Sequence, residues 1–279
     1  MRRNPEAVLT THIFDPKRRE LYVEGTRDVK FFSWLTTPNR DKDAVIVPID
    51  LVDVQLDESG GGNRQRLVNF LRIVAGSPAS ILGFVDRDQD DLLGIIDHPE
   101  NAVLTDYRDL ESYVLWEENV ARVLMLGCGI DKVSPKDFLD SAINAATFTA
   151  ACRLVSTQQS LELSISEADW PRKIAAKGGL VSSLNRKAIL TALLQRAKIS
   201  LQILDQLEKD IESAEDSMRA LEPQRYIHGK DMMRIMEKQL KSLGVIQPDV
   251  FSLFGPTFTR TLDEKQVNLK IAAQFVSTS

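Results

Sequence analysis

The residues best suited to chemistry in this sequence lie at a glycine turn near its start. The segment LYVEGTRDVKFFSWL, residues 21–35, predicts a short strand, a turn at Gly25 and then a helix. Glu24 ends the strand, and Asp28 follows one helical turn later. Two carboxylates with this spacing share one face of a helix start, where they form half of a site for a hard cation such as Mg²⁺. Taken alone, either acid is most often a helix-start acid, because the helix dipole favours a negative charge there.

Further acids follow the other predicted strands. They are Asp50 in VPID, Asp86 and Asp88 in FVDRD, and Asp106, Asp109 and Glu111 in TDYRDLE. In parallel sheets functional groups collect at the carboxyl ends of strands. Asp86 and Asp88 are two positions apart, so on an extended segment both face one side. A like-charged pair about 4 Å apart costs roughly 4 kcal/mol at an effective dielectric near 20. Such a cluster therefore needs protonation or a cation, and oxygen ligands favour Mg²⁺, Mn²⁺ or Ca²⁺ over zinc.

Several of these acids also have simpler interpretations. Asp50 is typical of a turn, and Asp106 and Asp109 are typical of helix caps. The loop acids after the third strand, Asp90, Asp91 and Asp97, are expected to be solvated. The Asp86–Asp88 pair gains weight from its place after a strand, with Glu24 after an earlier strand and Glu111 after a later one.

The elements that position these acids alternate between strand and helix over residues 1 to about 116. The predicted strands are RELYVEG, AVIVPIDL, ASILGFVDRD and AVLTDY, and the predicted helices are TRDVKFFSWL, NRQRLVNFLRIVAG and DLESYVL. This alternation predicts an α/β domain with a mostly parallel four-stranded sheet flanked by helices.

Residues 117–279 predict a mainly helical region that serves dimerisation or partner docking. Ser134-Pro135 predicts the start of a helix that runs to about Leu154. From Leu190 to Leu221 apolar residues recur every seven positions, with Ser200 as the exception, which predicts one helix roughly 45 to 50 Å long. This helix is either one arm of an intramolecular hairpin, or a homodimer seam or docking arm.

A shorter helix after YIHG carries basic residues on one face and apolar residues on another. The basic residues are Lys230, Arg234, Lys238 and Lys241, and the apolar residues are Met232, Met236, Leu240 and Leu243. Arg234, Lys238 and Lys241 are candidates for nucleic-acid binding, and a solvated outer face is the alternative.

Composition describes an ordinary globular protein with no exceptional charge. The 279 residues carry a net charge of -5, and 43% are hydrophobic. The two cysteines, Cys128 and Cys152, form no CxxC pair, so neither a zinc site nor a disulfide framework is expected. No apolar run is long enough for a transmembrane helix, and the basic start lacks the apolar core of a secretory signal, so a cytoplasmic protein is expected.

Three segments together resemble a known family. VEGTRDVKFF, GFVDRD and LTDYRDLESY resemble the Toprim nucleases of the OLD type, over about residues 20 to 115. The resemblance is nearest to the small Toprim effectors of PARIS anti-phage defence systems, which are encoded beside ABC-type ATPases. YIHGKDMM resembles a glycine-containing turn found late in that group.

This resemblance implies a nuclease with Mg²⁺ or Mn²⁺ that acts as a toxic effector in abortive infection and is controlled by an ABC-type ATPase partner. RNA such as tRNA is favoured over DNA as its substrate. Glu24 is implied as a metal ligand or general base, with Asp28, Asp86, Asp88 and Glu111 as further ligands and Lys230 as the basic catalytic residue.

Two other classes of function stay open from the sequence. Haloacid-dehalogenase phosphatases and nucleotide-sugar transferases also use a DxD motif with Mg²⁺. The phosphatases need Thr or Val where Asp90 stands, and the transferases leave Glu24 and Asp28 unexplained. The other class is a non-catalytic module that docks a partner.

Overall fold

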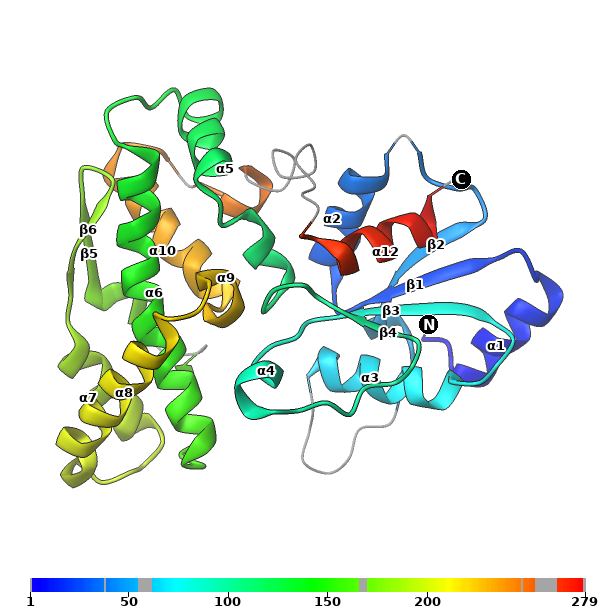
Figure 1. Cartoon of the computed structure of the whole chain (residues 1–279), viewed down its shortest axis with the longest axis horizontal. Coiled ribbons are helices and arrows are strands. Elements are labelled where there is room, and N and C mark those ends of the chain that lie inside the picture. The colour runs from blue at the N-terminus through cyan, green and yellow to red at the C-terminus, as the bar shows by residue number, and fades with distance from the viewer. Residues whose placement is uncertain are drawn as a thin grey trace. The chain divides into compact units, whose positions relative to one another are not determined.

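The computed structural model describes residues 2–37, 39–54, 62–165, 170–246, 248–253 and 265–277. The chain divides into two compact units, one made of Met1–Asp106 with Thr259–Ser279 and the other of Tyr107–Phe258. The first unit contains the predicted sheet, and the second is mainly helical (Figure 1).

The sheet of the first unit has four strands in the order β2-β1-β3-β4, and every pairing is parallel. The strands are β1 (Arg19–Val23), β2 (Ala44–Pro48), β3 (Ser80–Val85) and β4 (Ala102–Leu104). Helices α2 (Thr26–Thr36) and α12 (Val267–Val276) cover one face, and α1 (Pro5–Phe14) and α3 (Asn63–Val74) cover the other (Figure 1). The predicted α/β architecture with a parallel sheet flanked by helices is confirmed.

Helix α3 packs closely on strand β3, and this contact fixes where the start of α3 lies. Its apolar face is buried, as its spacing predicts. A Cβ atom at Gly83 of β3 would lie 2.2 Å from Leu71 Cδ1, so the helix approaches where the strand has no side chain. This packing carries Asn63 and Arg64, at the first turn of α3, to the carboxyl ends of the strands.

Replacing Gly83 with alanine should therefore destabilise the first unit. Leu71 is fully buried and has little room to move, so we expect a loss of about 1–3 kcal/mol in the free energy of unfolding, measured by urea denaturation. The double variant Gly83→Ala/Leu71→Val removes carbon where the new methyl group needs space. It should be more stable than the sum of the two single effects predicts. Additive losses would show that the close approach is not the cause.

The second unit is built around α6 (Pro135–Gln158), a helix of 24 residues. Its predicted start is confirmed, because the Ser134 side chain accepts a hydrogen bond from Asp137 N, although the helix ends at Gln158 rather than near Leu154. The other elements of this unit are η2 (Leu110–Val114), α5 (Glu117–Arg122), η3 (Val123–Gly127), η5 (Trp170–Lys173), β5 (Ile174–Lys177), β6 (Leu180–Leu184), α7 (Arg186–Arg196), η6 (Leu201–Ile203), α8 (Leu204–Met218), α9 (Pro223–Tyr226) and α10 (Gly229–Ser242).

The sequence pattern missed an antiparallel hairpin in this unit. Strands β5 and β6 pair where helix was predicted, and they turn at Gly178 and Gly179, which both have positive φ. Glycine adopts this backbone region without steric cost, so the pair marks a turn as well as a helix break.

The single long helix predicted from Leu190 to Leu221 is wrong. Helix α7 ends at Arg196 and α8 begins at Leu204, so the heptads are shared by two shorter helices. Between them Lys198 has a φ of 58°, and the Ser200 side chain accepts a hydrogen bond from Gln202 N, which starts a new turn. The seam position that Ser200 interrupts is therefore where the helix breaks.

The structure also divides the chain differently from the expected ranges 1–116 and 117–279. Helix α12, near the end of the chain, belongs to the first unit and packs on its sheet. Asp106 links the two ends of this unit, because its carboxylate accepts hydrogen bonds from Asn268 N at 2.9 Å and Leu269 N at 3.0 Å. Asp106 thus caps a helix more than 160 positions away, rather than the following helix that its alternative interpretation proposed.

Within the described ranges, no helix has both the length and the hydropathy that crossing a membrane requires.

Candidate functional site

The parallel register of β1 and β3 brings two predicted site residues together. Tyr22 pairs with Gly83, so Glu24 and Asp86 both lie just beyond the carboxyl ends of neighbouring strands. Asp86 N donates a hydrogen bond of 3.1 Å to Glu24 Oε1. The backbone of Glu24 is held as well, because Asn63 Nδ2 donates to its carbonyl oxygen at 2.8 Å. Two segments therefore hold Glu24 in place, the end of β3 through Asp86 and the start of α3 through Asn63.

Asp28 has a clear structural role at the start of α2. Its Oδ2 accepts a hydrogen bond of 2.8 Å from Gly25 N, which caps the helix. The helix-start interpretation of this acid is thus confirmed for one carboxylate oxygen. Its charge still reaches Glu24, whose pKa it raises.

The backbone of Asp88 does not have the extended conformation that its spacing predicts. Strand β3 ends at Val85, and Asp88 lies in a turn with a φ of 51°. The extended alternation that was expected to align Asp86 with Asp88 is therefore wrong. Aspartate is among the few residues with a side chain that visit this left-handed region, and such backbone strain gathers at functional sites.

Arg64 is the main residue of this site that the sequence did not reveal. Its Nε donates to the carbonyl oxygen of Asp86 at 2.8 Å and lies 3.3 Å from Asp88 Oδ2. Its Nη2 donates to Asp90 Oδ2. One guanidinium thus ties the whole turn that follows β3 to the start of α3.

Asp90 is not the solvated loop charge that was expected. Only 3% of the residue is exposed, and its Oδ2 lies 3.2 Å from His98 Nε2 besides its bond to Arg64. Burial raises the pKa of Asp90, while Arg64 and His98 oppose the rise. Asp91 and Asp97 form ion pairs with Arg87 and Arg72 on the surface.

Glu24 is the most perturbed acid of the cluster. Burial, followed by the charges of Asp88 and Asp28, raises its pKa to about 8, although the bond from Asp86 N and the charge of Arg64 oppose the rise. In such a carboxyl group, the ionised form is stabilised by any positive charge placed beside it. Its environment therefore fits the binding of a cation.

The donor atoms of the cluster fit a hard divalent ion, because all of them are carboxylate or carbonyl oxygens. Among the described residues, however, no three His, Cys, Asp or Glu side chains gather closely enough to hold one metal ion. Asp28 is turned to the backbone of Gly25 and Asp88 to Arg64. Coordination by several carboxylates therefore requires some of these contacts to be exchanged.

Glu111 belongs to the second unit and lies in a buried cluster there. Its neighbour Asp109 accepts hydrogen bonds from Ser112 N at 2.9 Å, Ser112 Oγ at 2.5 Å and Gly229 N at 2.7 Å. Burial and the charge of Glu111 raise the pKa of Asp109, and its donors oppose the rise. The cap interpretation of Asp109 is confirmed, and the two segments RDLES and YIHGKD meet at this point.

Lys230 follows this junction, at the first turn of α10, and its side chain is exposed. Lys230 and Glu111 thus belong to one unit, and Glu24, Asp28, Asp86 and Asp88 to the other. Within the first unit, Arg64 is a basic residue in direct contact with the acidic cluster.

Helix α10 is more deeply buried than its two-faced pattern predicts. The apolar face is in the core, and Arg234 and Lys238 are themselves partly buried. Lys238 Nζ donates to Ile174 O at 3.2 Å, and burial, Lys241 and Arg172 lower its pKa. Arg172, which the sequence did not single out, therefore adds to the positive charge near Lys238 and Lys241.

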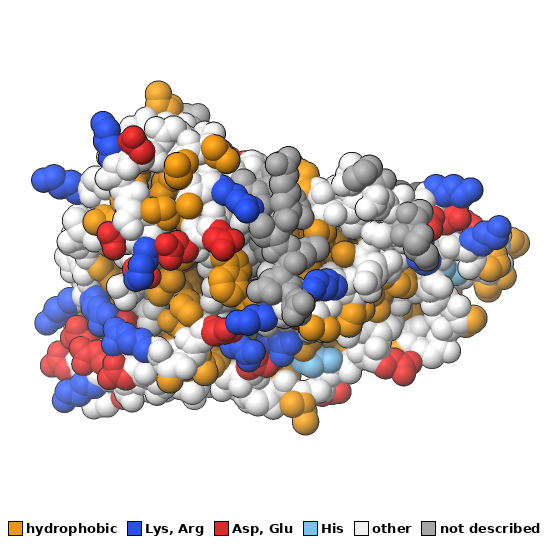
Figure 2. Space-filling view, turned by 45° about the horizontal axis from the view of Figure 1, so that its top comes forward, with side chains coloured by type: hydrophobic (Ala, Val, Ile, Leu, Met, Phe, Trp, Pro, Cys, Tyr) orange, Lys and Arg blue, Asp and Glu red, His pale blue; other side chains and the backbone are white. Residues whose placement is uncertain are grey.

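The face of the molecule in Figure 2 shows basic and acidic side chains intermixed on the helical unit. Acidic side chains gather at the lower left, over the part that contains α8. That view offers no continuous basic surface of the kind that binds nucleic acid through its phosphates.

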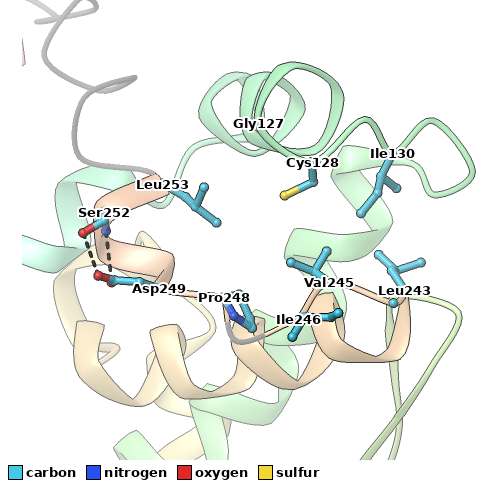
Figure 3. A pocket seen from close by; sticks show the side chains of 11 residues that line it. Gly127, Cys128, Ile130, Leu243, Val245, Ile246, Pro248, Asp249, Ser252 and Leu253 are labelled. Carbon is cyan, nitrogen blue, oxygen red and sulfur yellow. Dashed lines mark hydrogen bonds between the residues drawn. The ribbon is translucent and has the colours of Figure 1, made fainter.

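The second unit also contains an open, largely apolar pocket of about 480 Å³ (Figure 3). Cys128 and Ile130 line one side, and the other side is lined by residues that include Leu243, Val245, Pro248 and Leu253. Asp249 and Ser252 at its edge bond to one another. Burial raises the pKa of the Cys128 thiol, so it is not activated as a nucleophile. None of the predicted site residues lines this pocket.

No protein-family model matches the chain. No curated protein matches its sequence significantly.

Proposed function

We propose that this protein is a divalent-metal-dependent nuclease that cleaves phosphodiester bonds of nucleic acid at the carboxyl ends of β1 and β3. The observation that carries the proposal is the hydrogen bond between Asp86 N and Glu24 Oε1, with Asp88 and Arg64 beside it. A glutamate from one strand end is thereby fixed against the acidic turn of the next. This is the arrangement that the resemblance to Toprim nucleases implies.

Each residue of the cluster has a distinct role in this proposal. A bound Mg²⁺ or Mn²⁺ would supply a Lewis acid for a phosphate oxygen and a lowered pKa for the attacking water. Glu24 and Asp88 would hold the ion, and the carbonyl and carboxylate of Asp86 would offer further oxygen ligands. The pKa of Glu24 is raised to about 8, so this group is largely protonated at neutral pH, and a bound cation would favour the charged form that serves as its ligand. Arg64 balances the negative charge that these acids concentrate.

The resemblance also underlies the biological part of the proposal. RNA such as tRNA is proposed as the substrate in preference to DNA, and the activity is proposed to be a toxic effector in abortive infection, held by an ABC-type ATPase. Glu111 and Lys230 remain proposed members of the site from the same resemblance. Arg234, Lys238 and Lys241 remain the proposed contacts for the nucleic acid, and Arg172, whose charge lowers the pKa of Lys238, is proposed as a further one.

The proposal predicts chelator-sensitive cleavage that depends on Asp88. Purified protein with Mg²⁺ or Mn²⁺ should cut tRNA, and EDTA should stop the reaction. Asp88→Asn removes the charge but keeps the shape, and asparagine also tolerates a positive φ. We expect it to lower the cleavage rate by about a hundredfold or more with little change in the melting temperature.

Asp91→Asn is the matched control, because Asp91 lies in the same turn region and makes only a surface pair with Arg87. Its cleavage rate should equal that of the wild type. The same preparation should leave phosphomonoesters and nucleotide sugars intact. Turnover of those compounds with no cleavage of tRNA, mRNA or DNA would overturn the nuclease proposal in favour of another DxD enzyme.

A further inference from the structure

One guanidinium holds two acids that differ sharply in exposure. The Asp90 side chain is 4% exposed, and Arg64 Nη2 donates to its Oδ2. The Asp88 side chain is 44% exposed, and its Oδ2 lies 3.3 Å from Arg64 Nε. The same Nε donates to the backbone carbonyl of Asp86 at 2.8 Å. Arg64 therefore makes two short hydrogen bonds, to the Asp90 carboxylate and the Asp86 carbonyl, and one longer contact, to Asp88.

These three contacts differ in strength for physical reasons. Nε carries a single hydrogen, and the carbonyl of Asp86 accepts it at the shorter distance. An ion pair as exposed as that with Asp88 contributes about 0–1 kcal/mol. Asp90 is buried, so loss of its cationic partner would leave an uncompensated charge and cost several times more. The contact with Asp88 is thus the one that breaks while the others hold.

We propose that Arg64 sets the cation affinity of this site, because a divalent ion must take Asp88 from it. This inference rests on the proposed cation chemistry of Glu24 and Asp88. The ion and the guanidinium are both positive and both use the Asp88 carboxylate, so each weakens the other's hold on it. Asp86 and Asp90 keep Arg64 beside the site after the exchange.

The experiment compares Mn²⁺ binding by calorimetry in Asp90→Asn and in the double variant Arg64→Gln/Asp90→Asn. The double variant removes both members of the buried pair, so it leaves no unpaired buried charge to unfold the turn. We expect it to bind Mn²⁺ about threefold to tenfold more tightly than Asp90→Asn. Arg72→Gln, on the same helix and in an exposed pair with Asp97, should bind Mn²⁺ as the wild type does.

A second measurement detects the exchange directly in the wild type. Saturating Mg²⁺ should shift the NMR signal of Arg64 Nε and leave that of Arg72 in place. Equal or weaker Mn²⁺ binding by the double variant, or an unmoved Arg64 signal, would overturn the role of Arg64 while the cation site stands. Absence of saturable Mn²⁺ binding in the wild type would instead overturn the site itself, and this inference with it.

Discussion

Replacing Glu24 with glutamine should nearly abolish metal-dependent cleavage while leaving the fold intact. Glutamine has the same shape, and its Oε1 can still accept the hydrogen bond from Asp86 N that is 3.1 Å long in the wild type. What it loses is the charge that the proposed ion and the attacking water need. We expect the cleavage rate to fall by roughly a hundredfold to ten-thousandfold, measured on tRNA with Mg²⁺.

Although it lowers the cleavage rate, Glu24→Gln should raise the stability of the folded protein. The pKa of Glu24 is raised from 4.5 to about 8 by burial and by the charges of Asp88 and Asp28. Between these two values the folded protein holds a proton that the unfolded chain has released. Wild-type stability therefore falls as the pH rises through this window. Glutamine does not titrate, so Glu24→Gln should melt higher than the wild type at pH 8, and the difference should shrink towards pH 5.

Divalent ions supply a further comparison between the two proteins. Mg²⁺ should raise the melting temperature of the wild type, because an ion that binds only the folded state stabilises it. The Glu24→Gln variant should show little of this effect. A variant that is fully active, or that responds to Mg²⁺ as the wild type does, would contradict the placement of Glu24 at the centre of the site.

The sequence predicted the strand ends better than it predicted the contacts between them. Glu24 and Asp86 were found because a strand that ends in an acid leaves a local pattern. Arg64 left no such pattern, since an arginine on an amphipathic helix is ordinary and only the packing of α3 on Gly83 brings it to the turn. Asp90 was misjudged for the same reason, because its burial depends on Arg64 and His98 rather than on its neighbours in the chain.

Local helix breaks and long-range connections both account for the errors in the fold. The heptads around Ser200 satisfied a helical period, but a local capping bond and the backbone of Lys198 broke the helix. The place of α12 in the first unit depends on Asp106, which lies more than 160 positions before it. Periodicity reports which face of a segment is apolar, and it says little about where that face packs.

Gly229→Ala should strongly destabilise the second unit. A Cβ atom at this position would lie 2.4 Å from Glu111 Cβ and 2.6 Å from Asp109 Oδ1. Neither atom is the free end of a flexible chain, because Asp109 is held by the bonds from Ser112 and Glu111 Cβ is attached directly to the backbone. The crowding at Gly83 differs, since the nearest atom there is the tip of a leucine side chain.

Relief of this crowding would separate Gly229 N from Asp109 Oδ2 and leave a buried carboxylate with one donor fewer. Overpacking costs about 1–3 kcal/mol, and a lost bond to a buried charge adds about 1.5–3 kcal/mol. We therefore expect the free energy of unfolding to fall by about 3–5 kcal/mol in urea denaturation.

Gly127→Ala is the matched control in the same unit, because its new methyl group would meet its nearest neighbour at an ordinary 3.8 Å. That variant should unfold within about 1 kcal/mol of the wild type. If Gly229→Ala were equally well tolerated, the junction between the RDLES and YIHGKD segments would be loose. It could not then hold Glu111 and Lys230 in the fixed arrangement that a role in catalysis requires.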